Sequence, residues 1–158
     1  IHEYQQILKT YKDTVLDIKS NLIIQDKETQ TYLDDEADYL SELKNKYLTF
    51  AKRFYPNKRS GLVIKNNSGE NALRYILEAR IEDDSSDGVN EVRMFCFDCL
   101  LLICKKSKIR FIAHDSRLFA NMDPRQRETL FRIVFSEILH YRFLILSPVP
   151  SEVLMCIH

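Results

Sequence analysis

The sequence predicts an α/β fold with a parallel sheet, an antiparallel hairpin and a coiled-coil helical arm at its start. From residue 85 onward the patterns alternate as buried helix, strand, helix and strand, which is the order of a parallel sheet with crossover helices. Ahead of them, apolar residues recur at alternating spacings of three and four, as in a coiled-coil seam. We therefore expect two parts, with residues 1–55 as the arm and residues 56–158 as the globular lobe.

Composition and length limit the classes of partner and the cellular setting that we expect for this chain. The 158 residues have a formal net charge of zero, so the chain as a whole has no electrostatic attraction for nucleic acid. Apolar runs stay below the roughly 18 residues that a membrane span needs, so we expect no membrane partner. Four cysteines without the spacing of a disulfide framework favour a cytoplasmic setting. Because the sequence begins with Ile1 rather than Met, we expect a fragment of a longer chain.

The arm has a narrow seam that a polar stretch interrupts. Its first apolar positions are Ile1, Tyr4, Leu8, Tyr11, Val15, Ile18 and Leu22, and the pattern resumes at Leu33 and ends at Phe54, before Pro56. The stretch 25–31 is compatible with one long helix or with a break, since Thr31 and Asp34 have capping-box spacing. An amphipathic helix packed on its own domain is the alternative to a coiled coil.

Two strands and a buried helix follow. Residues 62–64 begin a strand, and residues 73–81 alternate with period two, which predicts an antiparallel pair. The next helix is apolar nearly all round, so its cysteines are expected to be buried thiols rather than zinc ligands. Asp98 within it needs a partner from another element, and the candidates are Arg74, Arg80, Arg110 and Arg142.

The stretch 108–126, KIRFIAHDSRLFANMDPRQ, combines an apolar strand, an aspartate at its end and a capped helix. Asp115 follows an apolar strand, and the carboxyl ends of strands are where open α/β sheets bind ligands. A carboxylate there suits Mg²⁺, although a turn or cap aspartate is the alternative. Asp123 is expected to cap a helix that has Pro124 in its first turn and Gln126 at the capping-box position.

A second candidate site opens the buried helix. Ser85, Ser86, Asp87 and Gly88 precede it, and backbone N–H groups at such a helix start attract anions. An ordinary capping turn is the alternative. None of the three glycines has the spacing of a phosphate-binding loop, so any phosphate cradle must come from another segment.

In this order, these segments resemble the carboxy-terminal lobe of ABC-type ATPases with coiled-coil arms. That class includes chromosome-structure-maintenance proteins, double-strand-break repair ATPases and recombination protein N. The strings SSDGVNEVRMFCFD and HDSRLFANMDPRQ are most similar to a largely uncharacterised bacterial family that includes ATPases of three-component ABC defence systems. The resemblance covers about residues 44–146.

The resemblance implies a half-head that shares ATP and Mg²⁺ with other segments. Residues 85–88 resemble the signature motif, residues 111–115 resemble Walker B with Asp115 on magnesium, and residues 118–123 resemble the D-loop. The implied cofactor-binding residues are Ser85, Ser86, Asp87, Gly88, Asn121 and Asp123, and the implied catalytic group is His114, Asp115 and Ser116. The implied partners are an amino-terminal P-loop lobe of the same protein, a second head in a homodimer, and DNA or an accessory protein.

Three positions depart from the pattern of that class. Ser116 stands where a catalytic glutamate is usual, and His114 is the nearest group that could act as the base. Ser147 stands in place of the switch histidine, and His140 precedes the strand. Asp87 replaces the first signature glycine. Nucleotide binding with slow or absent hydrolysis is therefore one expectation.

Basic residues supply two further candidates. Lys52, Arg53, Lys58 and Arg59 form a cluster that suits either a nucleic-acid backbone or a solvated face. Arg117, Arg125 and Arg127 lie near the D-loop-like segment, where they could contact phosphates or an opposing head.

The leading expectation is an ATPase half-head in DNA maintenance or anti-phage defence, inactive without the P-loop lobe. The alternative is a non-enzymatic coiled-coil module for dimerisation or docking. A metal-dependent phosphohydrolase or nuclease built on His114 and Asp115 is the weakest hypothesis, because the sequence has no second His/Asp cluster to complete such a metal site.

Overall fold

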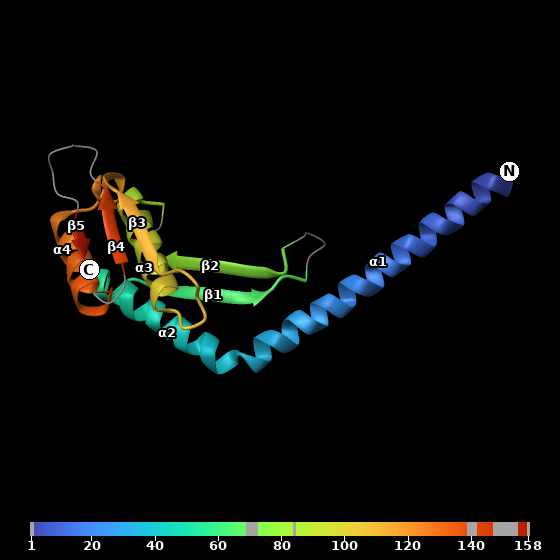
Figure 1. The fold of residues 1–158 in the computed structure, drawn as a ribbon, viewed down its shortest axis with the longest axis horizontal. Coiled ribbons are helices and arrows are strands. Elements are labelled where there is room, and N and C mark those ends of the chain that lie inside the picture. The colour runs from blue at the N-terminus through green and yellow to red at the C-terminus, as the bar shows by residue number, and fades with distance from the viewer. Residues whose placement is uncertain (1, 69–72, 84, 139–141, 147–154, 158) are drawn as a thin grey trace. The chain divides into compact units, whose positions relative to one another are not determined.

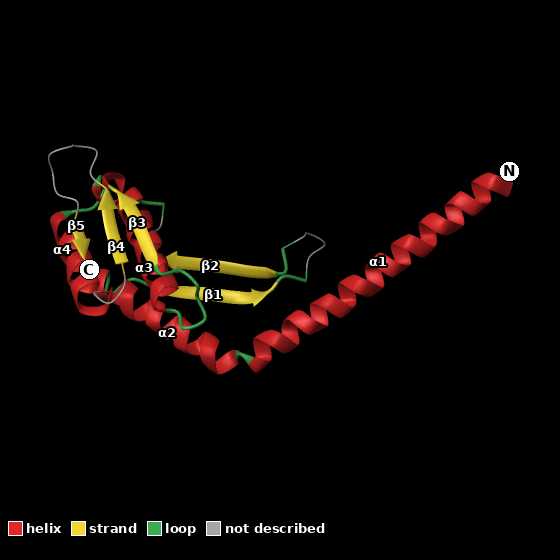
Figure 2. Cartoon of the chain, viewed as in Figure 1, coloured by secondary structure: helices red, strands yellow, loops and turns green. Residues whose placement is uncertain are grey.

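The fold is a mixture of helices with two small sheets, as seen in a computed structural model (Figures 1 and 2). The structure describes all residues except 1, 69–72, 84, 139–141, 147–154 and 158. The chain divides into two compact units, one of residues 1–40 and 64–77 and the other of residues 41–63 and 78–158. Among the described residues, no helix is long and apolar enough to cross a membrane.

The arm consists of two helices, α1 (His2–Asp35) and α2 (Ala37–Phe54). Of the two alternatives for residues 25–31, the continuous helix is the one observed, because α1 runs through that stretch and ends at Asp35. The Thr29 and Thr31 hydroxyls donate to the carbonyl oxygens of Gln25 and Lys27, at 2.7 and 2.9 Å. Thr31 therefore bonds back to its own helix instead of capping a new one.

The hairpin is formed by β1 (Ser60–Asn66) and β2 (Tyr75–Ile81), the antiparallel pair that the sequence predicts. In the first unit, the Asn66 amide donates to the Asp26 carboxylate at 2.8 Å. The period-two apolar positions of β2 are not all buried. Tyr75 and Leu77 are 46% and 52% exposed, and Ile81 is 2% exposed. The alternation thus predicted the strand correctly, but only its end enters a core.

The core of the second unit forms around α3 (Asp87–Ile103), which the sequence predicts as a buried helix. Phe95, Cys96 and Cys99 are fully buried, and burial raises the pKa of both thiols. The Phe95 ring meets that of Phe54 edge-on at 5.9 Å between centroids. The two cysteines are therefore buried thiols, as expected.

The second sheet has the order β3–β4–β5 (Figure 1). Its strands are β3 (Phe111–Asp115), β4 (Arg142–Leu146) and β5 (Met155–Ile157). β3 and β4 pair in parallel, with Asp115 opposite Leu146, and β4 and β5 pair antiparallel. The described sheet is thus mixed, whereas the sequence predicts a parallel one. Between β3 and β4 lie a 3₁₀ helix (Ser116–Phe119), α4 (Pro124–Ile133) and a π-helical turn (Val134–Ile138).

The packing of α3 gives a first prediction. Phe95→Ala should lower the free energy of unfolding by about 3–5 kcal/mol, because it leaves a cavity in the core. Met94 is the matched control, since its side chain is 51% exposed on the same helix. Met94→Ala should change the free energy of unfolding by less than about 0.5 kcal/mol. Urea titration of both variants and the wild type measures these differences. Equal losses for the two variants would contradict the assigned orientation of α3.

Candidate functional site

The candidate site begins at the carboxyl end of β3. Asp115 is the last residue of this strand, and Ser116 starts the 3₁₀ helix directly after it. The backbone therefore has Asp115 at the strand end that the sequence predicts. The side chains of Asp115, Ser116 and Arg117 lie outside the described part of the structure, as do His140 and Ser147.

The amino-terminal end of α3 is the second part of the site. Ser86 is the N-cap residue of this helix in an extended conformation, and its hydroxyl makes no capping hydrogen bond. Ser85, Ser86 and Asp87 are exposed, whereas Gly88 is buried. The chain thus passes from exposed serines to a buried glycine within the first two residues of α3.

Gly88 brings the two predicted motifs together. A Cβ atom at position 88 would lie 2.5 Å from the backbone oxygen of Asn121, and 3.6 Å from Oε1 of Gln126. Real Cβ atoms essentially never come so near to a backbone oxygen. Glycine at position 88 therefore permits the start of α3 to touch the loop after β3. Two segments separated by more than thirty residues meet at this point.

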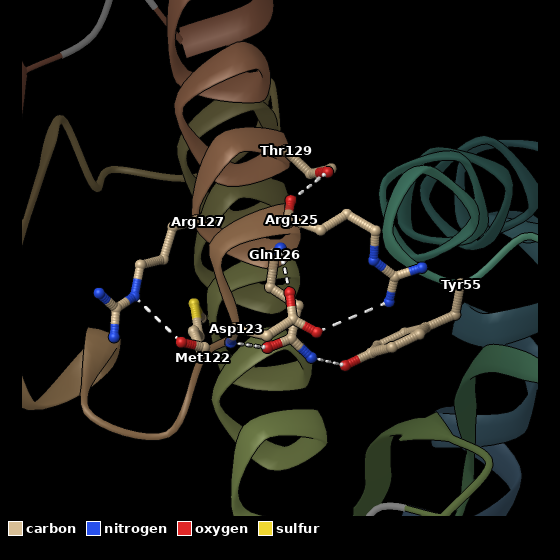
Figure 3. A network of polar contacts seen from close by, with 7 residues as sticks. All are labelled: Tyr55, Met122, Asp123, Arg125, Gln126, Arg127 and Thr129. Carbon is tan, nitrogen blue, oxygen red and sulfur yellow. Dashed lines mark hydrogen bonds and ion pairs between the residues drawn. The ribbon is translucent and has the colours of Figure 1, made fainter.

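The loop at residues 121–123 is held by hydrogen bonds from α4 (Figure 3). Asp123 Oδ1 accepts from the Gln126 N–H at 2.8 Å, and Gln126 Oε1 accepts from the Asp123 N–H at 2.7 Å. This reciprocal pair is the capping box that the sequence predicts, with Pro124 in the first turn. One oxygen of the Asp123 carboxylate thus caps α4, which leaves the other oxygen for any further contact.

Arginines near this loop hold it in place. Arg127 donates to the backbone oxygens of Met122 at 3.0 Å and Phe119 at 2.8 Å. Arg125 lies 3.9 Å from the Asp123 carboxylate and is 65% exposed. Of the two, Arg127 already has structural partners, and Arg125 is the more available for a ligand.

Tyr55 belongs to the same network, although no pattern in the sequence predicts it. It follows the last residue of α2, and its hydroxyl accepts a hydrogen bond from Nε2 of Gln126 (Figure 3). Both side chains are buried, and burial raises the pKa of the Tyr55 hydroxyl. Lys58 Nζ lies 5.0 Å from the Tyr55 ring centroid. Only tertiary packing brings residues 55 and 126 together, so no local pattern could have revealed this contact.

His114 faces α3 rather than standing alone at the strand end. Its Nε2 is 3.4 Å from Oδ2 of Asp98, and its ring centroid is 6.4 Å from that of Phe95. Burial raises the pKa of the Asp98 carboxyl, and the nearby His114 lowers it in part. The described partner of Asp98 is therefore a histidine, and the expectation of an arginine is wrong for Arg74, Arg80 and Arg110. The side chain of Arg142, the fourth candidate, lies outside the described part of the structure. Arg80 instead pairs with Glu78, and Arg110 donates to the Ser107 carbonyl.

The basic cluster is largely engaged within the protein. Lys52 donates to the carbonyl oxygens of Pro56 and Lys58, at 2.8 and 3.1 Å. Arg53 pairs with Glu137 at 2.6 Å, and Lys58 pairs with Asp83 at 3.1 Å. These contacts reduce the positive charge available for a nucleic-acid backbone. In the described part of the chain, no three His, Cys, Asp or Glu residues gather as a metal site.

Fold and site together define a mixed α/β protein in which the start of a buried helix contacts the loop after an aspartate-ended strand. The chain belongs to the family described as "uncharacterised protein conserved in bacteria" (DUF2326), whose model matches residues 50–142. The match includes Tyr55, Gly88, Asn121 and Gln126, and it leaves out most of the arm. No curated protein matches the chain.

The contact at Gly88 gives a second prediction. Gly88→Ala should lower the free energy of unfolding by about 1–3 kcal/mol, because the new methyl group meets a fixed backbone oxygen. Gly61→Ala is the control, since a Cβ there has no atom within 4 Å. Thermal and urea unfolding of both variants should separate them. A Gly88→Ala variant as stable as Gly61→Ala would refute the close approach.

The Asp98 carboxyl gives a third prediction, on pH. Its pKa is raised by folding, so the folded state holds this proton more tightly and loses stability as pH rises through the raised value. Asp98→Asn should therefore be more stable than wild type at pH 7. That gain should vanish near pH 4, around the ordinary pKa of an aspartate. Asp17→Asn, at an exposed aspartate, is the control. If the stability of Asp98→Asn relative to wild type increased toward acid pH, the raised pKa assigned to Asp98 would be wrong.

Proposed function

We propose that this chain is the carboxy-terminal half of a coiled-coil ABC-type ATPase head. The single observation that best supports the proposal is the contact of Gly88 with Asn121. It joins the signature-like start of α3 to the D-loop-like segment that follows β3. In such a head, both segments border nucleotide at the junction of two subunits.

Each candidate residue has a role in this proposal. Asp115 would hold Mg²⁺ from the end of β3, because a carboxylate is a hard oxygen ligand. The N–H groups at the start of α3, with the Ser85 and Ser86 hydroxyls, would meet the terminal phosphate of ATP on a second head. The phosphate cradle itself would come from a P-loop lobe, because none of the three glycines here fits one.

The residue after Asp115 argues against rapid hydrolysis of ATP. Ser116 follows Asp115 where a general base is expected, and a serine hydroxyl does not take a proton from water at neutral pH. His114 is the nearest imidazole, and it lies against Asp98 and Phe95. We therefore propose binding of ATP and Mg²⁺ as the primary activity, with hydrolysis slow. DNA maintenance or defence against phage is the proposed setting.

A coiled-coil interaction module is the second candidate, and the surface of α1 favours it. Several apolar side chains of its seam are exposed in the described structure, among them Tyr4, Leu8, Tyr11 and Ile18. An exposed a/d seam on a helix of 34 residues is suited to pairing with another helix. Such a module would dimerise without nucleotide.

One experiment separates the two functions and is the fourth prediction. In full-length protein, Mg-ATP should shift sedimentation from monomer to dimer, and Asp115→Ala should weaken ATP binding at least about tenfold, through loss of the magnesium ligand. The exposed Asp17→Ala, on α1, should behave as wild type. Identical behaviour of Asp115→Ala and wild type would remove the magnesium role. A dimer that ignores ATP would favour the interaction module.

A further inference from the structure

The Gln126 side chain is a buried bridge with both of its polar atoms engaged. Its exposed fraction is 7%, the same as that of Tyr55. Oε1 accepts from the Asp123 N–H at 2.7 Å, and Nε2 donates to the Tyr55 hydroxyl. A buried amide without partners is costly, so each of these contacts favours the other by holding the side chain in one conformation.

The Oε1 end of this bridge lies beside the close approach of Gly88 to the Asn121 backbone. Gln126 Oε1 is 3.6 Å from the position that a Cβ of residue 88 would occupy, beside the Asn121 backbone. A shift of the Gln126 amide would therefore release the Asp123 N–H and alter the packing at Gly88 together. The loop at residues 121–123 depends on a side chain whose far end is fixed by Tyr55 (Figure 3).

Tyr55 is itself anchored at the base of the helical arm. It directly follows α2, and its backbone N–H donates to the Ala51 carbonyl at 2.9 Å. The ammonium group of Lys58 lies over its ring and also pairs with Asp83, three residues before the N-cap of α3. The residues after α2 thus reach Gln126, which caps the loop at residues 121–123, through Tyr55, and reach Asp83, just before the start of α3, through Lys58.

We propose that Tyr55 is a positioning residue for the loop at residues 121–123, acting through Gln126. Its hydroxyl holds the Gln126 amide against the Asp123 N–H, and so keeps this loop against Gly88. The positioning role of Tyr55 does not depend on the proposed function. Its consequence does rest on that function: Tyr55 then affects how the loop at residues 121–123 and the start of α3 contact nucleotide.

Hydrogen exchange tests the positioning role without nucleotide, and it is the fifth prediction. In full-length protein, Tyr55→Phe should speed exchange of the Asp123 and Gln126 amides about fivefold, because the acceptors of both are side chains of the capping box. Amides inside α3, such as that of Cys99, should keep their rates. Unchanged rates at residues 123 and 126, or an equal rise throughout the lobe, would overturn the proposal.

A double-variant comparison makes this test specific to Gln126. Gln126→Met removes both hydrogen bonds at similar size, so it should speed exchange at Asp123 by itself. Adding Tyr55→Phe to Gln126→Met should then change this rate less than twofold, because the two residues act in series. Tyr32→Phe, at a tyrosine that is 51% exposed and outside the named seam positions, is the control for loss of a hydroxyl. Additive effects of Tyr55→Phe and Gln126→Met would overturn the role through Gln126.

A nucleotide measurement tests the consequence for the site. Tyr55→Phe should weaken ATP-dependent dimerisation about fivefold and leave the binding of Mg-ATP to a single head within twofold of wild type. Equal losses in both measurements would indicate a general structural role and overturn the positioning role. If wild type binds no ATP, the proposed function fails, whereas the exchange rates still decide whether Tyr55 positions the loop.

Discussion

The structure around the candidate site depends on one steric constraint, the close approach of Gly88 to the backbone of Asn121. With a side chain at position 88, the start of α3 could not touch the loop after β3. The capping box of α4 holds the other side of this contact, since Asp123 and Gln126 fix the residues that follow Asn121. One glycine and one helix cap thus define how two distant segments meet. This contact, more than any single charged residue, brings the two segments of the candidate site together.

Most of the polar side chains discussed in the second unit form hydrogen bonds or ion pairs within that unit. Arg127 holds the loop by its carbonyl oxygens, Lys52 closes the turn after α2, and Arg53 pairs with Glu137. The His114–Asp98 pair joins β3 to α3 next to the strand end that has Asp115. Because these groups are already engaged, the proposed nucleotide site depends on backbone N–H groups, on the serines before α3 and on Asp115, with Arg125 as the more available arginine nearby. This division suits a half-site that another lobe completes.

Several elements follow from local sequence rules and could be predicted. Pro124 and the Asp123–Gln126 spacing define the start of α4, the apolar run defines α3 as buried, and the alternation at residues 73–81 defines β2. The place where the arm is interrupted was not predictable in the same way. Residues 25–31 include Gln25, Lys27, Glu28 and Gln30, which are good helix formers, and α1 continues through them to Asp35. Residues 31 and 34 have the spacing of a capping box, but the Thr31 hydroxyl bonds to the Lys27 carbonyl within α1 instead.

The sequence by itself determined that an aspartate ends an apolar strand, that serines and a glycine open a buried helix, and that none of its three glycines has the spacing of a phosphate-binding loop. Each of these is a pattern of neighbouring residues, which local chemistry fixes. Only the tertiary structure decided that Gly88 touches Asn121, that Asp98 pairs with His114 rather than an arginine, and that Tyr55 reaches Gln126. Those contacts join residues far apart in the chain. Their partners are chosen by how the buried faces of α2, α3 and α4 pack, and no spacing along the sequence encodes that choice.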